Sequence, residues 1–221
     1  MKTEKDKEGV VGVFDRRAEE YDHWFENSLL FDIELSGLQD LETEFGHPGL
    51  EIGVGPGRFA RELLIDYGLD PAFTPLLMAN KRGVKTVQAR GEFLPFASGS
   101  MAAVFILFTL CFLAAPFKVL EESYRVLGLH GHLILGIIPS SGPWGQYLQA
   151  KKEKSHPFYR YASFYEGSYW QNILADFPFL MVEGRSTLFQ PPDQLTGPES
   201  SRPGIWRQAG FQITVWEKTK T

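Results

Sequence analysis

Apolar residues recur at helical spacing near the start of the chain and predict two helices there. The first pattern comprises Phe14, Ala18, Tyr21 and Phe25. The second pattern comprises Leu30, Ile33, Leu38, Leu41 and Phe45. Ser28 is suited to cap the second helix, and Gly46 and Pro48 are expected to end it.

Beyond Pro48 the pattern changes to short apolar runs that alternate with helical ones. The runs predict strands at Gly49–Val54, Tyr67–Asp70, Val84–Gln88, Ala102–Thr109, His132–Ile138, Leu180–Phe189 and Phe211–Trp216. Helices are predicted at Pro56–Ile65, Phe73–Lys81, Phe117–Leu127 and Phe164–Phe177. Because strands alternate with helices, we expect βαβ units and a mainly parallel sheet.

Composition and charge narrow the class of protein. The net charge of −5 argues against a large surface for binding nucleic acid. Cys111 is the only cysteine, so no disulfide can form within the chain, and no histidine spacing matches a metal-binding motif. The charged N-terminus lacks the apolar core of a signal peptide, and the longest apolar run, Met101–Phe117, is too short to span a membrane. We therefore expect a cytoplasmic protein with no metal and no membrane partner.

A glycine-rich loop is the strongest chemical signal in the sequence. Gly53, Gly55 and Gly57 lie at alternate positions between a predicted strand and a predicted helix. Glycine lets a ligand approach the backbone, and the free N–H groups of the helix start, where Pro56 suits the first turn, attract an anion. The charge of Glu51 would oppose a pyrophosphate there but suit an amino group. The third glycine also comes one position too early for the G-x-G-x-x-G motif, which argues against a nicotinamide dehydrogenase.

Asp70 ends the next predicted strand, and two interpretations of it stay open. Its carboxylate could accept hydrogen bonds from both hydroxyls of a ribose, as the acidic residue of dinucleotide-binding folds does. An Asp that precedes a proline, here Pro71, is also common in turns and helix caps. Its position after the glycine loop favours the ribose.

Further segments make the chain similar to the class I S-adenosylmethionine-dependent methyltransferases, specifically the small-molecule type that includes ubiquinone- and menaquinone-biosynthesis methyltransferases. The segments that carry the resemblance are Phe14–Asp22, Leu50–Phe59, Gly68–Pro71, Gly91–Phe96 and Glu122–Leu127. It implies an α/β, Rossmann-like fold whose seven-stranded, mostly parallel sheet has helices on both faces, an antiparallel last strand and an N-terminal helical lid. It also implies S-adenosylmethionine as the cofactor.

The resemblance further implies which residues hold this methyl donor. The expected donor-binding set is Tyr21, Glu51, Gly53, Gly55, Gly57, Asp70, Pro71, Gly91, Glu92, Phe93, Thr109 and Leu110. The glycine backbone would hold the methionine part, with Glu51 near its amino group, and Asp70 would bind the ribose. Arg90 stands where the family often has an Asp that accepts a hydrogen bond from the adenine. Because Arg only donates, we expect adenine to rely on backbone contacts.

The methyl acceptor is expected above the carboxyl ends of the strands, where ligands of open α/β sheets bind. The Ser140–Tyr165 segment interrupts the regular alternation and is rich in aromatic residues, so we expect it to contact a small-molecule substrate together with the N-terminal helix. The expected acceptor contacts are Tyr21, Phe25, Trp144, His156 and Tyr159. Tyr21, Trp24, Trp144 and Tyr159 are candidates for an aromatic wall beside the sulfonium, although packing is the favoured interpretation of Trp24. No residue is predicted to be catalytic, because methyl transfer from a sulfonium depends mainly on alignment.

We expect one domain over residues 1–221. Residues 1–46 would form the helical lid, 47–139 the donor-binding core, 140–165 the substrate-side insertion, and 166–221 a C-terminal helix and strands. The oligomeric state stays open. The alternative function is a non-catalytic module that binds S-adenosylmethionine or S-adenosylhomocysteine, since methyl transfer has no obligatory catalytic signature.

Overall fold

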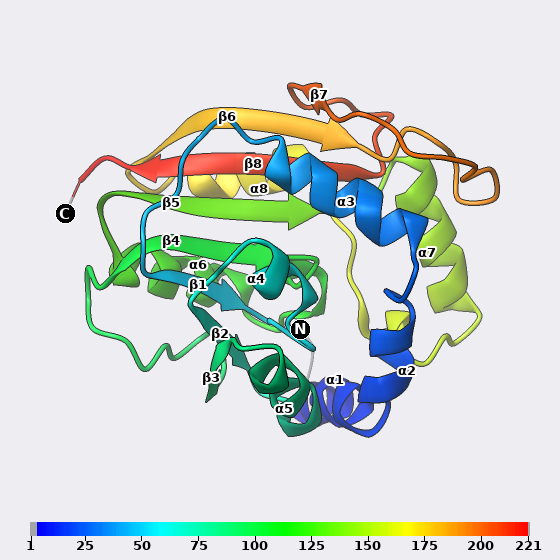
Figure 1. Ribbon diagram of the computed structural model, residues 1–221, viewed down its shortest axis with the longest axis horizontal. Coiled ribbons are helices and arrows are strands. Elements are labelled where there is room, and N and C mark those ends of the chain that lie inside the picture. The colour runs from blue at the N-terminus through cyan, green and yellow to red at the C-terminus, as the bar shows by residue number, and fades with distance from the viewer. Residues whose placement is uncertain (1–3, 221) are drawn as a thin grey trace.

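The computed structural model describes residues 4–220 and shows one mixed β-sheet with helices on both faces (Figure 1). The strands are β1 (Gly49–Ile52), β2 (Tyr67–Asp70), β3 (Lys85–Gln88), β4 (Met101–Leu107), β5 (Leu127–Ile137), β6 (Phe179–Thr187), β7 (Arg202–Pro203) and β8 (Phe211–Lys218). The helices are α1 (Glu4–Arg16), α2 (Ala18–His23), α3 (Leu29–Gln39), α4 (Arg58–Glu62), α5 (Phe73–Lys81), α6 (Pro116–Val126), α7 (Pro143–Glu153) and α8 (Gly167–Leu174), with short 3-10 segments η1 (Leu110–Phe112) and η2 (Tyr159–Tyr161).

The sheet has the order β3-β2-β1-β4-β5-β8-β6-β7. The first five strands of this order are parallel, and β8 runs antiparallel to both β5 and β6. The Rossmann-like class and the antiparallel last strand are therefore confirmed. The predicted number of seven strands is wrong by one, because β7 pairs with β6 inside a polar segment that has no apolar alternation to reveal it.

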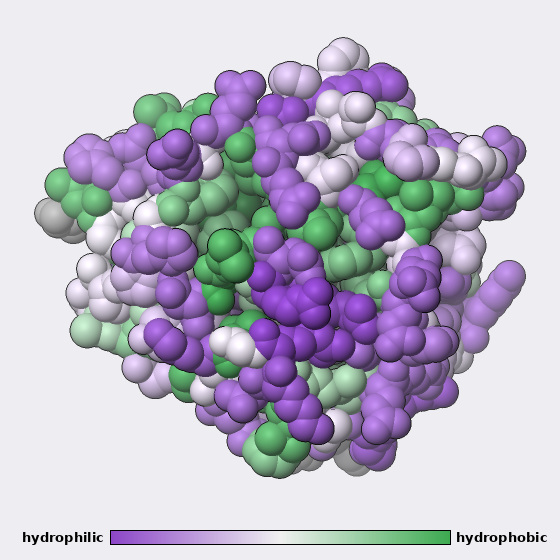
Figure 2. Space-filling view, in the orientation of Figure 1, coloured by the Kyte–Doolittle hydropathy of each residue, from purple (hydrophilic) through white to green (hydrophobic). Residues whose placement is uncertain are grey.

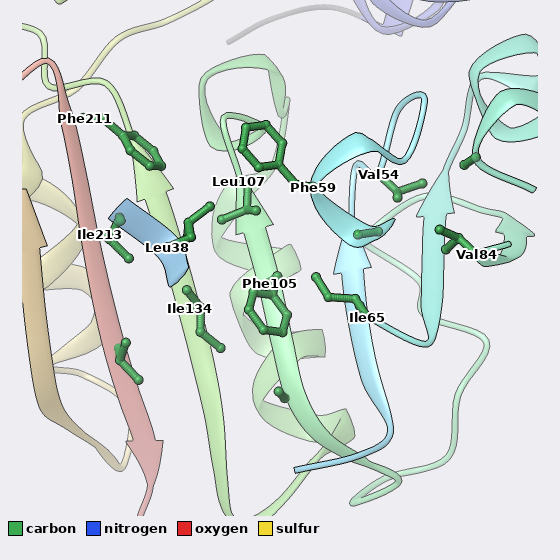
Figure 3. Packing of buried hydrophobic residues seen from close by; sticks show 14 of the residues in the cluster. Leu38, Val54, Phe59, Ile65, Val84, Phe105, Leu107, Ile134, Phe211 and Ile213 are labelled. Atoms are coloured by element: carbon green, nitrogen blue, oxygen red, sulfur yellow. The ribbon is translucent and has the colours of Figure 1, made fainter. Parts of the chain in front are cut away.

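Two hydrophobic clusters fill the two faces of the sheet. On one face, Leu38 of α3 and Phe59 of α4 pack over side chains of β4, β5 and β8, as Figure 3 shows. On the other face, Val119 and Leu120 of α6 and Trp170 of α8 cover the sheet. Burial of this apolar surface is the main force that holds both helical layers against the strands.

The helix α4 separates a polar surface from this core. Arg61 is exposed, whereas Phe59 and Ala60 are buried. Figure 2 shows hydrophilic residues gathered over the middle of this face of the molecule, where α4 lies in Figure 1. Across residues 4–220, no helix is long and apolar enough to cross a membrane.

Several helix boundaries differ from the sequence prediction for physical reasons. Ser28 caps α3 as predicted, accepting a hydrogen bond from the Phe31 N–H at 3.3 Å. The helix α3 ends at Gln39 instead of reaching Phe45, and beyond it the carboxylate of Glu183 accepts hydrogen bonds from the N–H groups of Glu42 and Thr43, which therefore do not bond along a helix. The insertion at 140–165 is not irregular throughout, since it contains α7 and η2.

Candidate functional site

The glycine loop follows β1, and its three glycines differ in what a side chain would meet. Gly53, Gly55 and Gly57 all adopt left-handed backbone conformations, with φ of 76°, 51° and 78°. A Cβ on Gly57 would lie 2.7 Å from the Ala79 Cβ, and one on Gly53 would collide with Thr109. A Cβ on Gly55 would meet only the Tyr21 ring, at 3.9 Å. Gly53 and Gly57 therefore serve tight packing, and Gly55 presents bare backbone to open space.

The start of α4 differs from the prediction. Gly57 is the N-cap of the helix, so Pro56 lies in the loop and not in the first helical turn. Proline still fits this place, because its fixed φ stiffens the turn between the two left-handed glycines.

A cavity of about 160 Å³, here called the loop cavity, opens in front of Gly55. Its walls come from the carboxyl ends of neighbouring parallel strands and the loops that follow them: Glu51–Pro56 and Arg58 at β1, Asp70–Ala72 at β2, Arg90–Glu92 after β3 and Leu107–Thr109 at β4. Phe14 of α1 and Tyr21 of α2 close it from the N-terminal side. This is the edge of an open α/β sheet at which ligands bind.

Two carboxylates give the loop cavity its polarity. Glu51 is 3% exposed, and its Oε2 atom has no hydrogen-bond partner. Burial raises the pKa of Glu51 well above its usual value, and the charge of Asp70 adds to the effect. Asp70 accepts hydrogen bonds from the Ala72 N–H at 2.8 Å and the Gly55 N–H at 3.1 Å. Burial outweighs these two hydrogen bonds and raises the pKa of Asp70 to about 6.

An ion-pair cluster fixes the N-terminal helices over the loop cavity. Asp22 of α2 is 5% exposed and receives hydrogen bonds from Arg58, at 2.6 and 3.0 Å, and from Arg82, at 2.7 Å. Burial alone would raise the pKa of Asp22, but the two guanidinium groups lower it overall. The cluster therefore ties α2, which also carries Tyr21, to the start of α4 and the end of α5. The sequence pattern assigned no role to Asp22 or Arg82.

A second cavity of about 110 Å³, here called the aromatic cavity, adjoins the first. Its lining comes from α2, α3, η1, the end of β5, α7, η2 and the start of α8. Tyr21, Phe25, Phe108 and Phe112 line both cavities. The two cavities therefore adjoin along these four side chains.

One acidic side chain stands in this apolar lining. Glu34 of α3 is 5% exposed, and no hydrogen bond or ion pair joins it to any residue within 9–220, where side chains are described. Burial raises its pKa to about 8. Sequence reasoning missed Glu34, although a signal exists: it lies one turn from both Leu30 and Leu38, on the apolar face of its helix.

Most of the expected donor residues line the loop cavity. They are Tyr21, Glu51, Gly53, Gly55, Asp70, Pro71, Gly91, Glu92 and Thr109. Gly57 packs beneath the loop, and Leu110 lines the aromatic cavity instead. Phe93 lines neither cavity; it is 71% exposed, with the Lys118 ammonium 6.0 Å from its ring centre. Arg90 is exposed at the rim of the loop cavity.

The expected acceptor residues are brought together with one exception. Tyr21, Phe25, Trp144 and Tyr159 line the aromatic cavity. His156 does not; its ring packs against Tyr159 at 4.9 Å and Trp24 at 5.7 Å, and its Nδ1 atom is buried without a partner. Trp24 lines the cavity as well as packing, so the favoured interpretation of Trp24 as a packing residue was incomplete.

Comparisons with known proteins agree with this geometry. Residues 50–135 match the family model of a methyltransferase domain. A Thermotoga maritima protein, described as a SAM-dependent methyltransferase and possible histamine N-methyltransferase, is 31% identical with a TM-score of 0.88, over 95% of this chain and all of that chain. A protein of Mycobacterium tuberculosis is 38% identical over 200 residues, which cover 89% of this chain and 70% of that protein. One of Methanocaldococcus jannaschii is 37% identical over 186 residues, 84% of this chain and 89% of that protein.

Proposed function

This chain belongs to the S-adenosylmethionine-dependent methyltransferases, and from that premise we propose that it methylates a small molecule bound in the aromatic cavity. The proposal assigns the loop cavity to the methyl donor and the aromatic cavity to the acceptor. The observation that carries it is the shared wall of Tyr21, Phe25, Phe108 and Phe112. Because both cavities are lined by these four residues, they adjoin there, and a donor in one and an acceptor in the other could face each other directly, as methyl transfer requires.

The residues of the loop cavity fit the donor. The bare backbone at Gly55 leaves room for a ligand to approach, and the unpartnered Glu51 oxygen suits the ammonium of a methionine moiety. Asp70 offers a carboxylate for ribose hydroxyls while its hydrogen bonds hold the loop. When bound, S-adenosylmethionine supplies an activated methyl group, and the side chains of this chain supply binding and alignment.

The aromatic cavity supports catalysis over the alternative of a non-catalytic binding module. A protein that only bound the donor would need no second cavity on the far side of Tyr21. Aromatic rings at the junction also attract a sulfonium, by about 0.5–2 kcal/mol for each favourable cation–π contact. The description of the Thermotoga maritima neighbour as a possible histamine N-methyltransferase supports an acceptor of small size.

A matched pair of cavity-filling variants tests the two assignments. Ser163 lines only the aromatic cavity, and Ala114 lines only the loop cavity. We expect Ser163→Phe to lower methyl transfer from labelled S-adenosylmethionine, measured over a panel of small acceptors, at least tenfold while S-adenosylhomocysteine still binds within twofold of wild type. Ala114→Phe should lower affinity for S-adenosylhomocysteine at least tenfold.

Two results with these variants would contradict the proposal. Full methyl transfer by Ser163→Phe would show that the acceptor binds elsewhere. Unchanged calorimetric affinity for S-adenosylhomocysteine in Ala114→Phe would remove the donor from the loop cavity. Circular dichroism and thermal melting of both variants establish that each is folded.

A further inference from the structure

The carboxylate of Glu34 is the feature of the aromatic cavity that packing does not explain. Its side chain lines the cavity, is 5% exposed, and has no hydrogen-bond or ion-pair partner in the described part of the chain. No Lys, Arg or His is found among the described residues that line this cavity. A buried charge without a partner is costly, whereas an apolar residue on this helix face would cost nothing.

The groups around Glu34 indicate which kind of ligand could bind to its carboxylate. Tyr21 of α2 and Tyr159 of η2 lie close enough that the charge of Glu34 contributes, after burial, to raising the pKa of both hydroxyls. Neither hydroxyl is hydrogen-bonded to a residue between 9 and 220, so both remain available as acceptors. Cys111 of η1 and Tyr165 before α8 are the other titratable groups that line the cavity. A carboxylate, two phenol oxygens and surrounding ring faces together favour a ligand with a positive charge and several N–H donors.

Resting on the proposed function, we infer that Glu34 selects a basic amine as the methyl acceptor, binding its ammonium group while the aromatic rings hold an apolar body. For transfer, the ammonium gives one proton to the Glu34 carboxylate. The freed nitrogen lone pair then forms the N–C bond as the S–C bond of the donor breaks, which leaves S-adenosylhomocysteine and a methylated ammonium product. A metal ion fits this place poorly, because no group of three or more His, Cys, Asp or Glu side chains able to hold one occurs within residues 4–220. An anionic acceptor would be repelled by the ionised form of Glu34 and would gain no ion pair with its protonated form. A neutral alcohol could accept a hydrogen bond from the protonated acid but would forgo the ion pair.

The protonation of Glu34 provides a signature of this binding mode. Because its pKa is about 8, the free protein holds Glu34 mostly protonated at pH 7. Pairing with an ammonium requires the carboxylate form, so binding an amine at pH 7 should release close to one proton into solution. At pH 9 the carboxylate is already ionised, and no release is expected.

Calorimetry with amines and their matched alcohols tests the inference. The probes are phenethylamine with 2-phenylethanol and tryptamine with tryptophol, titrated into the protein saturated with S-adenosylhomocysteine. We expect each amine to bind at least tenfold more tightly than its alcohol. At pH 7 the heats of amine binding measured in phosphate and in Tris buffer should differ by the amount that one released proton implies.

Two variants of α3 distinguish the effect of the carboxylate in the cavity from the effect of any negative charge on this helix. Glu34→Gln should weaken amine binding at least tenfold, abolish proton release, and leave alcohol and S-adenosylhomocysteine affinities within twofold. Asp32→Asn removes an exposed charge from the same helix and should change none of these quantities.

Three outcomes would overturn the inference: equal affinity for amine and alcohol, unchanged amine binding by Glu34→Gln, or no binding of any of the four probes. Its failure is distinguishable from failure of the proposed function. If amines show no preference while Ser163→Phe still blocks methyl transfer, the aromatic cavity holds an acceptor of another class. If amines bind through Glu34 but Ser163→Phe transfers methyl groups normally, the cavity binds amines without serving the reaction.

Discussion

The two cavities of this protein contrast in how they are built. The loop cavity is formed by backbone turns at the ends of four parallel strands, with Gly55 and Asp70 at its centre. The aromatic cavity is formed by side chains from elements that are far apart in the sequence. Each holds a buried carboxylate without a full set of partners, Glu51 in the first and Glu34 in the second. Both cavities therefore contain a buried carboxylate, although they are built differently. Only the loop cavity is formed by residues that make a continuous motif in the sequence.

Removing the open backbone of the loop cavity should have the largest effect. Gly55→Val places a branched side chain in the space toward Tyr21, at a residue with φ of 51°, so we expect S-adenosylhomocysteine binding to fall more than a hundredfold. Isothermal titration calorimetry measures this loss. Amine binding to the donor-free aromatic cavity should persist, and its disappearance would mean that the two cavities are not separate sites.

A neighbouring glycine provides the control for this experiment. In Gly57→Ala the added Cβ would meet the Ala79 backbone, with its Cα at 2.8 Å, so the cost falls on packing. Thermal melting should show a clear loss of stability for Gly57→Ala. A loss of donor affinity without loss of stability would contradict the packing role assigned to Gly57.

The buried carboxylate of Glu34 should make the free energy of unfolding depend on pH. Glu34 has a pKa of about 8 in the folded protein against 4.5 in the reference state, so the folded form binds its proton more tightly than the unfolded chain does. Wild-type stability should therefore fall as pH rises from 4.5 to 8, and Glu34→Gln should not share this loss. The variant should gain about 2–4 kcal/mol at pH 8 and nothing below pH 4. Urea unfolding without ligands at several pH values measures the difference.

The sequence predicted the loop cavity far better than the aromatic one. Gly53, Gly55 and Asp70 belong to short segments whose spacing is dictated by the single β1–α4–β2 unit, so local pattern and tertiary position coincide. Sequence analysis did not predict a role for Glu34, because a single acid on an apolar helix face becomes part of a site only through the elements that pack around it. The short strand β7 was not predicted for a related reason: its two residues form a strand only because they lie beside β6.

The role of Asp70 can be separated into loop support and donor contact. Asp70→Asn retains a similar shape, but its amide group cannot accept from both the Gly55 and Ala72 N–H groups. We expect donor affinity to fall by about 1–3 kcal/mol, the range for a hydrogen bond to a charged group. Because the pKa of Asp70 is about 6, wild-type affinity should decline below pH 6, and that decline should vanish in the variant. A loss of stability with unchanged affinity would instead identify Asp70 as a turn residue only.

The smallest expected effect concerns the wall that the cavities share. Tyr21 lines both cavities and meets the rings of Phe14, at 5.2 Å, and Phe25, at 5.3 Å, edge to face, whereas Tyr159 lines the aromatic cavity alone. Tyr21→Leu keeps an apolar side chain but loses the ring, so affinities for S-adenosylhomocysteine and for phenethylamine should both fall about three- to tenfold, as loss of about 1 kcal/mol of ring contact implies. Tyr159→Leu should weaken only phenethylamine. Calorimetric titration of both ligands into both variants gives four affinities, and the pattern of three losses with one unchanged value follows only if Tyr21 divides two adjoining sites. A matching loss of donor affinity in Tyr159→Leu would instead place Tyr159 in the donor site as well.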